Sequence, residues 1–346
     1  MKDSFSINLD EVDNFSDYLM PSSEEIGKLK AAPDVNDELT DFIMNDSDNG
    51  AFLPWSKTTA DFRIRPSEVT VLAAQNGAGK SVIVSQMCLY LLRERYSGGK
   101  RNRVLMISPE MSVAQNMSRA VRQIMAKTNE QLNEPDIGAS LSWLGDRYYI
   151  YDHLGNVDPE VILGLIRYGA SELGITHVVI DNLTCLKLTN SAADVNLSTK
   201  NFMGDLVSVS RDTGTHIFVV AHVRKPAGSQ NERQDKYSIR GASEVSDLSD
   251  NVLLLQRDWT RGEKLNQLDP MTDSESYQEY LKKPSSYLEI AKQRHGEGTL
   301  RRYALWFDTP SLRFMSKPDI MPRAFEETES FHRAVGGKSS AGYQEH

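Results

Sequence analysis

Residues 69–81 read VTVLAAQNGAGKS, and this stretch decides the fold of the chain. An apolar, β-branched run enters a glycine-rich turn that ends in Gly79-Lys80-Ser81, and an apolar helical pattern follows. A strand, such a turn and a helix N-terminus form a P-loop, in which backbone N–H groups surround the phosphates of a nucleotide. In such a loop Lys80 would pair with the β- and γ-phosphates, and the Ser81 hydroxyl would bind Mg²⁺. The pattern predicts binding and hydrolysis of ATP, or of another NTP or dNTP, with Mg²⁺.

The loop departs from the full G-x-x-x-x-G-K-[ST] pattern at its first position, which is Ala74. Gly77 and Gly79 remain where the backbone comes closest to phosphate, and alanine is the smallest alternative to glycine. We therefore expect a working loop. The predicted nucleotide-binding residues are Ala74, Gln75, Asn76, Gly77, Ala78, Gly79, Lys80 and Ser81.

The composition is that of a globular protein, with 39% hydrophobic and 25% charged residues among 346. No apolar run approaches the roughly 18 residues that span a membrane, and the two cysteines provide no disulfide framework. We expect a cytoplasmic protein (in the host cytoplasm if phage-encoded) without a membrane partner. The first 50 residues hold thirteen acidic and three basic side chains, a net charge of −10 against −9 for the whole chain. The rest of the chain is therefore close to neutral, so that local basic loops can still bind nucleic acid.

Three regions are expected: an acidic arm with linker helices at 1–50, an ATPase domain at 51–322, and a flexible tail at 323–346. In the arm, a capping-box pattern begins at Pro21, and Leu39, Phe42 and Ile43 form an apolar stripe at helical spacing. This arm is either a pair of short helices that dock on a neighbouring subunit or a disordered acidic segment.

Strand and helix patterns alternate between residue 51 and about residue 315. This order predicts an α/β fold, a mostly parallel sheet flanked by helices. The last four predicted strands of this region are closely spaced and would extend the sheet at one edge. The predicted strands are 69–74, 103–108, 148–151, 176–181, 216–222, 251–256, 287–292, 303–307 and 312–315, and the predicted helices are 82–95, 112–127, 158–173 and 197–213.

Three of these strands end in polar residues suited to phosphate chemistry. Asp181 ends an apolar strand, as a Walker B acid does, and would hold Mg²⁺. Glu110 follows another; if that strand lies beside the P-loop strand, Glu110 could activate the attacking water, and otherwise it caps the helix that begins near Ser112. His222 ends a third strand, where it could sense the γ-phosphate.

The residues after His222 form a basic loop of about 15 residues without apolar side chains. It includes Arg224, Lys225, Arg233 and Lys236. A loop of this length inside a domain is usually functional or disordered. It is either a solvated surface loop or a nucleic-acid contact.

Taken in order, these motifs resemble the RecA-like motor domain of the DnaB-like hexameric replicative helicases, in particular those of phages without a fused primase. The resemblance covers roughly residues 50–316. The matching segments are Leu53-Pro54-Trp55, the P-loop, Ser108-Pro109-Glu110-Met111-Ser112, Ile180-Asp181-Asn182-Leu183, Ala221-His222-Val223-Arg224-Lys225-Pro226, Ile239-Arg240-Gly241-Ala242-Ser243 with Leu248-Ser249-Asp250, and Lys292-Gln293-Arg294-His295-Gly296.

The resemblance implies roles for further residues. Lys292 and Arg294 would reach the nucleotide site of a neighbouring subunit, with Arg294 as the arginine finger. Arg257 and Phe307 match positions that sandwich the nucleotide base, although an acidic insertion at 258–285 blurs the alignment. The residues expected to face single-stranded DNA are Lys187, Arg224, Lys225, Arg233, Lys236 and Arg240.

The resemblance also implies a ring, a homo-hexamer or heptamer, that moves 5′ to 3′ on single-stranded DNA. A primase, polymerase or loader would be a separate chain. Two other functions stay open from the residues: a RecA- or KaiC-like ATPase that binds DNA or signals without unwinding, and an assembly ATPase of the helicase-loader type.

Overall fold

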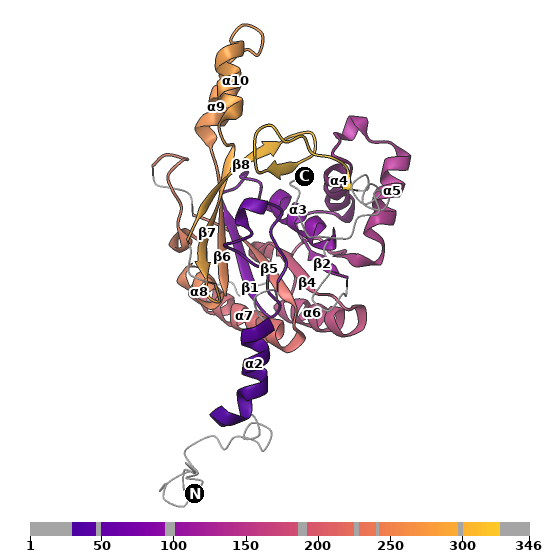
Figure 1. Ribbon diagram of the computed structural model, residues 1–346, viewed down its shortest axis with the longest axis vertical. Coiled ribbons are helices and arrows are strands. Elements are labelled where there is room, and N and C mark those ends of the chain that lie inside the picture. Colours follow the sequence, from indigo (N-terminus) through magenta and orange to yellow (C-terminus); the bar gives the residue numbers. More distant parts are fainter. Residues whose placement is uncertain are drawn as a thin grey trace, which may run out of the picture. The chain divides into compact units, whose positions relative to one another are not determined.

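The computed structural model describes residues 30–45, 50–93, 101–185, 192–224, 228–239, 242–296 and 300–325 (Figure 1). The chain divides into two compact units, residues 1–49 and residues 50–346. In the first unit a short 3-10 turn leads into helix α2, Asn36–Asn45, as the apolar stripe predicts. The earlier predicted helix, from Pro21 onward, lies almost entirely outside the described residues.

The second unit is built on a single sheet. Among its described residues, nine strands pair in the order β3-β2-β4-β5-β1-β6-β7-β8-β9. The first six in this order are parallel, and β7, β8 and β9 continue the edge as an antiparallel meander. The strands are β1 Val69–Ala74, β2 Val104–Ile107, β3 Tyr148–Tyr151, β4 His177–Asp181, β5 His216–His222, β6 Asn251–Arg257, β7 Ser286–Gln293, β8 Arg302–Asp308 and β9 Arg313–Met315.

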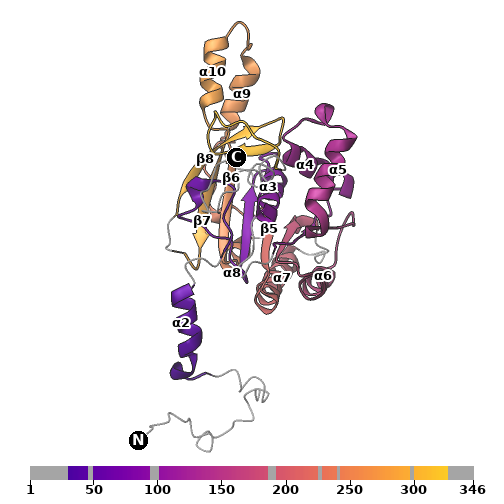
Figure 2. The same ribbon diagram turned by 45° about the vertical axis from the view of Figure 1, so that its right-hand side comes forward.

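Helices cover both faces of this sheet (Figures 1 and 2). The parallel strands are apolar on both sides because each side faces a helical layer, which is why β1, β2 and β4 read as continuous apolar runs. Helices α3 (Lys80–Arg93), α4 (Val113–Met125) and α5 (Glu134–Leu144) pack on one face. Helices α6 (Pro159–Leu173), α7 (Ala192–Thr213) and α8 (Ala242–Leu248) pack on the other. The predicted α/β class with an antiparallel edge is confirmed.

The strand order corrects one assumption. The strand that precedes Glu110 was considered as a neighbour of the P-loop strand, but β2 is separated from β1 by β4 and β5. The reason is that β2 pairs directly with β4, and β5 pairs with β1. Glu110 therefore follows a strand beside the one that ends in Asp181.

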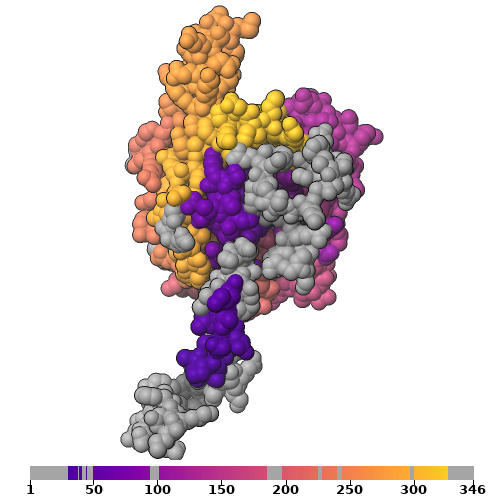
Figure 3. All heavy atoms as spheres, viewed as in Figure 1, coloured from indigo at the N-terminus to yellow at the C-terminus, as the bar shows by residue number. Residues whose placement is uncertain are grey.

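Several helices were not predicted. Helix α5 begins after Asn133, which caps it, but its apolar pattern is interrupted by Gly138 and Ser140. The acidic insertion forms two helices, α9 (Trp259–Gln267) and α10 (Ser274–Lys282). They project together from the body that carries the sheet (Figures 1 and 3).

The C-terminal boundary of the packed body also differs from the prediction. Residues 323–325 were assigned to the flexible tail, but Phe325 is 3% exposed and packs on Trp143, with ring centroids 5.5 Å apart. The buried Arg313 holds this end, since its guanidinium donates to the carbonyl oxygen of Arg323 at 2.8 Å and also reaches the last turn of α4. Residues 326–346 lie outside the described part.

Candidate functional site

The P-loop connects β1 to α3 with the backbone geometry that phosphate binding needs. Gly77 and Gly79 have φ angles of +75° and +99°, which side chains rarely adopt. A Cβ atom on Gly79 would lie 2.9 Å from the Phe314 ring, so strand β9 supports the loop from behind. Phe314 is fixed in turn by Gln86 of α3, which bonds both its backbone N–H and its carbonyl oxygen. Ala74 in the first loop position ends β1 and pairs with His222 and Leu255.

Lys80 and Ser81 begin α3 and lie beside Asp181. The Lys80 ammonium donates to the carbonyl oxygens of Ala74 and Gln75 at 3.3 and 3.1 Å. Asp181 is 3% exposed, and burial raises the pKa of its carboxyl, while a hydrogen bond from Ser81 and the charge of Lys80 lower it. The sequence-predicted loop residues and the Walker B acid are thus brought together.

The residues around Asp181 can be tested for their fit to Mg²⁺. The buried Oδ1 atom of Asp181 has no hydrogen-bond partner among the described residues, and the Ser81 hydroxyl lies next to this carboxylate. Among the described residues, no group of three or more His, Cys, Asp or Glu side chains is placed to hold a metal. A cation here would take its other ligands from phosphate and water, as Mg²⁺ usually does. The residues fit the ion; bound, it would neutralise charge on the β- and γ-phosphate oxygens.

Glu110 is in the same cluster although β2 is not next to β1. Its charge raises the pKa of Asp181, which places the two carboxylates within electrostatic reach. The alternative role as a helix cap is wrong, because Ser112 caps α4: its side chain accepts from the Gln115 backbone N–H, and Gln115 reaches back to Ser112. Glu110 is exposed and free of that structural task.

Glu110 is connected to His222 through the loop after β4. Thr184 Oγ1 lies 3.5 Å from Glu110 Oε1 and also bonds Asn182. The side-chain oxygen Oδ1 of Asn182 accepts from the backbone N–H of Thr184, so the side-chain nitrogen Nδ2 of Asn182 faces His222 Nε2 at 3.1 Å. In this arrangement the Asn182 amide N–H donates to His222 Nε2. The ends of β2, β4 and β5 are therefore linked side chain to side chain.

Replacing Glu110 by Gln is expected to leave nucleotide binding intact and to lower turnover by at least about 10²-fold, the lower range for a positioned proton acceptor. The amide keeps the shape of the side chain but cannot accept a proton. Nucleotide affinity by titration and single-turnover hydrolysis measure the two effects separately. Glu130→Gln is the matched control, because Glu130 is an exposed glutamate on the short 3-10 turn that follows α4. Loss of nucleotide binding in E110Q would instead make Glu110 structural.

Arg119 of α4 is a site residue that the sequence reasoning missed. Its guanidinium donates to the Ser81 carbonyl oxygen at 3.1 Å, and burial lowers the pKa of this side chain while the charge of Asp181 opposes the shift. A cation at this point can compensate charge close to the P-loop. The signal in the sequence was an arginine within the helix that directly follows Glu110.

The two residues expected at the nucleotide base approach the P-loop from β6 and β8. Arg257 donates to the Gly77 carbonyl oxygen at 3.2 Å, and its guanidinium lies over the Trp259 ring at 4.7 Å. Phe307 packs on Phe314 with centroids 4.9 Å apart. The aromatic side chain next to Arg257 is thus Trp259, which the sequence reasoning did not select.

Lys292 and Arg294 lie near the amino ends of the parallel strands, opposite the end that carries the P-loop. Lys292 is in β7, which pairs with β6, and Arg294 follows β7 directly. The backbone N–H of Arg294 donates to the carbonyl oxygen of Asp250, which lies five residues before Leu255, the β6 partner of Ala74. Five residues correspond to roughly 17 Å along a strand. Arg294 therefore does not serve the P-loop of its own chain.

The two cations differ in how they are held. The Lys292 ammonium donates to the carbonyl oxygens of Ser246, Asp247 and Ser249 at 2.6–2.9 Å, which closes the C-terminal end of α8. Burial lowers the pKa of Lys292. Arg294 pairs with Asp250 at 3.1 Å, and its side chain is 39% exposed. Arg294 is thus the more accessible of the two.

The expected DNA-contacting residues are only partly described. Arg224 is exposed, Arg233 pairs with Glu289 at 2.9 Å, and Lys236 lies 5.2 Å from the Tyr237 ring centroid. The remaining three, Lys187, Lys225 and Arg240, lie outside the described residues.

The fold and this site define a P-loop ATPase. Residues 46–228, more than half of the chain, match the family described as an AAA domain, and the chain belongs to that family. A curated relative, the DNA helicase/primase of Enterobacteria phage T3, is 22% identical over 205 residues, which is 56% of this chain and 36% of the relative. The chain thus matches about a third of that protein.

Solved structures share the fold. One describes a DnaB-like replicative helicase and its interactions with primase; it has a TM-score of 0.61 and 14% identity, and the match covers 83% of this chain and 67% of that one. A second, an ATPase domain, has a TM-score of 0.64 and 16% identity, with 81% and 97% covered. The resemblance to DnaB-like helicases is confirmed at the level of the fold. Within the described residues, no helix has the length and apolar character needed to cross a bilayer.

Proposed function

We propose that this chain is the motor of a ring-forming replicative DNA helicase, which hydrolyses ATP between subunits and moves on single-stranded DNA. The observation that carries the proposal is the separation of the two halves of the site. The P-loop, Asp181 and Glu110 gather at the carboxyl ends of the strands, whereas Arg294 stands roughly 17 Å away at their amino ends. A finger placed there can act only on the nucleotide of another subunit, and repetition of this contact around an axis closes a ring.

In the proposed reaction, a water molecule attacks the γ-phosphorus in line with the bond to the leaving ADP oxygen. Glu110 orients this water and accepts its proton. Lys80 and Arg119 offset charge on the phosphates from within the chain, and Arg294 of the neighbouring subunit does so from outside. Mg²⁺, held by Ser81 and through Asp181, would screen the phosphate oxygens. Arg257 and Phe307 would flank the base.

The helicase assignment draws on the relatives. The phage relative is a DNA helicase/primase, and one structural neighbour is a DnaB-like replicative helicase studied with primase. By this likeness we propose a hexamer or heptamer with 5′ to 3′ movement, a primase or loader as a partner, and action in the cytoplasm of a host cell. The acidic arm would contribute its helices to the contacts between subunits.

The direct test is unwinding of a forked duplex with a labelled strand, in the presence of ATP and Mg²⁺. The proposal expects strand separation that depends on a 5′ single-stranded tail. DNA-stimulated hydrolysis without strand separation would favour the RecA- or KaiC-like alternative. Hydrolysis indifferent to DNA would favour a loader-type ATPase.

Neutralising Arg224 is expected to weaken single-stranded DNA binding and to flatten its salt dependence. Each lost phosphate contact lowers the slope of log K against log[salt] by about 0.7 for a single strand. Arg233→Ala should have a smaller effect, because Arg233 is already paired with Glu289. Arg211→Ala, exposed at the end of α7 before β5 begins, is the control. A slope that R224A leaves unchanged would exclude Arg224 from the DNA path.

A further inference from the structure

The P-loop side chain of Gln75 contacts two segments outside the loop. Its Oε1 atom accepts from the Trp259 indole N–H at 3.0 Å, and its Nε2 atom donates to the carbonyl oxygen of Gln230 at 3.1 Å. Trp259 is the first residue of α9. Gln230 belongs to residues 228–239, the longer of the two described parts of the loop after β5. One side chain of the phosphate loop therefore bridges the helical insertion and the proposed DNA segment.

Asn231 makes a second set of contacts between the loop after β5 and the start of α9. Its Oδ1 atom accepts from the backbone N–H of Trp259 at 2.8 Å, and its Nδ2 atom donates to Thr260 Oγ1 at 2.5 Å. Asp258 Oδ1 lies 3.4 Å from the same Nδ2 atom and also caps α9 through the Arg261 N–H. The side chain of Asn231 is thus fixed to the start of α9, while the backbone of Gln230 is fixed to the P-loop.

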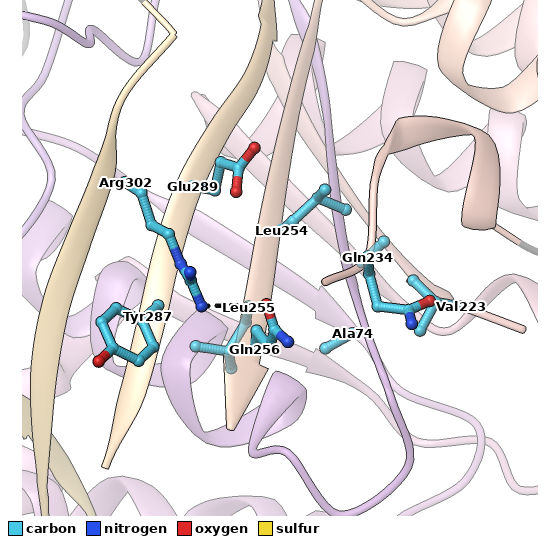
Figure 4. Close-up of a pocket in the computed structure, with 10 residues that line it drawn as sticks. Ala74, Val223, Gln234, Leu254, Leu255, Gln256, Tyr287, Glu289 and Arg302 are labelled. Atoms are coloured by element: carbon cyan, nitrogen blue, oxygen red, sulfur yellow. Dashed lines mark hydrogen bonds between the residues drawn. The ribbon is translucent and has the colours of Figure 1, made fainter. Parts of the chain in front are cut away.

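The rest of the segment is held mainly by polar contacts. Gln256 of β6 donates to the carbonyl oxygens of Asn231 and Glu232 at 3.0 and 3.1 Å, and Arg233 pairs with Glu289 of β7. Figure 4 shows a small pocket between the segment and the strands. Gln234 lines it opposite Leu254, Gln256, Glu289 and Arg302, and Arg302 donates to Gln256 at 3.1 Å. Ile239 fixes the end of the segment in the apolar core. The preceding residues, held by directional bonds beside a pocket, can change position without exposing that core.

Trp259 also touches the part of the loop that must accept phosphate. Its ring lies 3.4 Å from where a Cβ atom on Gly77 would be, and Arg257, stacked on this ring, donates to the Gly77 carbonyl oxygen. Binding of phosphate uses the N–H groups of this same turn. Any adjustment of Gly77 or Gln75 on nucleotide binding therefore acts directly on Trp259 and on residue 230.

We propose that Trp259 and Asn231 are positioning residues that transmit the occupancy of the P-loop to residues 228–239 and so set their affinity for single-stranded DNA. The inference rests on the proposed function, since it assumes that this segment binds DNA. It adds a route that the strand-end contact between Asn182 and His222 does not provide, because it runs through the helical insertion of this chain.

The test measures the coupling between nucleotide binding and DNA binding rather than the affinity for either ligand alone. The dissociation constant of the full chain for a labelled single-stranded oligonucleotide is determined with and without a non-hydrolysable ATP analogue and Mg²⁺, and the ratio of the two is the coupling factor. The wild-type ratio should be at least about fivefold, the lower end of typical coupling between sites. In Asn231→Ala and Trp259→Phe the ratio should approach 1. Trp259→Phe keeps an aromatic side chain but removes both the N–H that bonds Gln75 and the outer part of the indole that faces Gly77.

Gln230→Ala is the matched control, because residue 230 contributes only its backbone carbonyl to the junction. It should keep the wild-type ratio. Ratios that N231A and W259F leave unchanged would overturn the inference, and so would a parallel loss of both affinities at a constant ratio, which indicates a purely structural role. A wild-type chain that binds DNA with a ratio of 1 overturns the inference alone. A wild-type chain that binds no DNA overturns the proposed function as well.

Discussion

Replacing Lys80 by alanine is expected to abolish measurable ATP hydrolysis. Lys80 is 7% exposed, stands at the first position of α3, and donates to the carbonyl oxygens of Ala74 and Gln75 in the P-loop. Loss of one preorganised charge-stabilising donor costs about 10²–10³-fold in turnover, and Lys80 also contributes to ground-state binding of the phosphates. Steady-state hydrolysis at saturating nucleotide is the measurement.

Lys200→Ala is the matched control for this substitution, because Lys200 is exposed on α7, on the opposite face of the sheet from α3. It should keep wild-type turnover. Thermal unfolding of both variants shows whether the fold survives. A folded K80A protein that still hydrolyses ATP would contradict the assignment of residues 74–81 as the catalytic phosphate loop.

Replacing Arg294 by alanine is expected to lower turnover by about 10³-fold or more, the effect of removing an arginine finger. The physical reason is that a planar, permanently charged group stabilises the charge of the transferring phosphoryl group. Arg294→Lys should recover little, because a lysine lacks the fork geometry. In the neighbouring subunit, whose P-loop the finger would serve, turnover should fall far more than nucleotide affinity.

Because Arg294 pairs with the buried Asp250, its removal could also act through stability. Mixing separates the two effects. R294A subunits keep an intact P-loop and K80A subunits keep an intact finger, so a mixed assembly should regain part of the lost activity. No recovery in mixtures of folded, co-assembled variants would contradict a site shared between subunits.

The sequence was sufficient for the elements that local pattern determines. Each of these elements has an apolar run or a glycine-rich turn whose end is marked by a particular residue type. They are β1, the turn at Gly77 and Gly79, and the strands that end at Asp181 and His222, and all lie where they were expected. The pairing of β8 with β7 and of β9 with β8 was also predictable, because the short spacings between these strands leave room only for antiparallel pairing.

Long-range pairing was beyond the sequence reasoning. Nothing local to residues 103–108 indicates that β2 pairs with β4 rather than with β1, since a parallel strand can join any neighbour through a helix. The site nevertheless contains Glu110, because the carboxyl ends of all parallel strands share one edge.

Residues that enter the site through tertiary packing were also missed. Arg119 reaches Ser81 only because α4 packs against α3, and Trp259 reaches Gln75 only because α9 begins where β6 ends. Neither belongs to a short motif. The contacts of Lys292 could not be predicted for the same reason, because the three carbonyl oxygens that it binds belong to the end of α8 and to the residue that follows it, and α8 was not predicted.

The central claim, a DNA-dependent motor whose catalytic site is completed by a neighbouring subunit, is tested most directly by ATP turnover per chain, measured across protein concentration with and without single-stranded DNA. The account predicts that specific turnover rises steeply with concentration as subunits assemble, and rises further with DNA. Specific turnover that is independent of both concentration and DNA would contradict it.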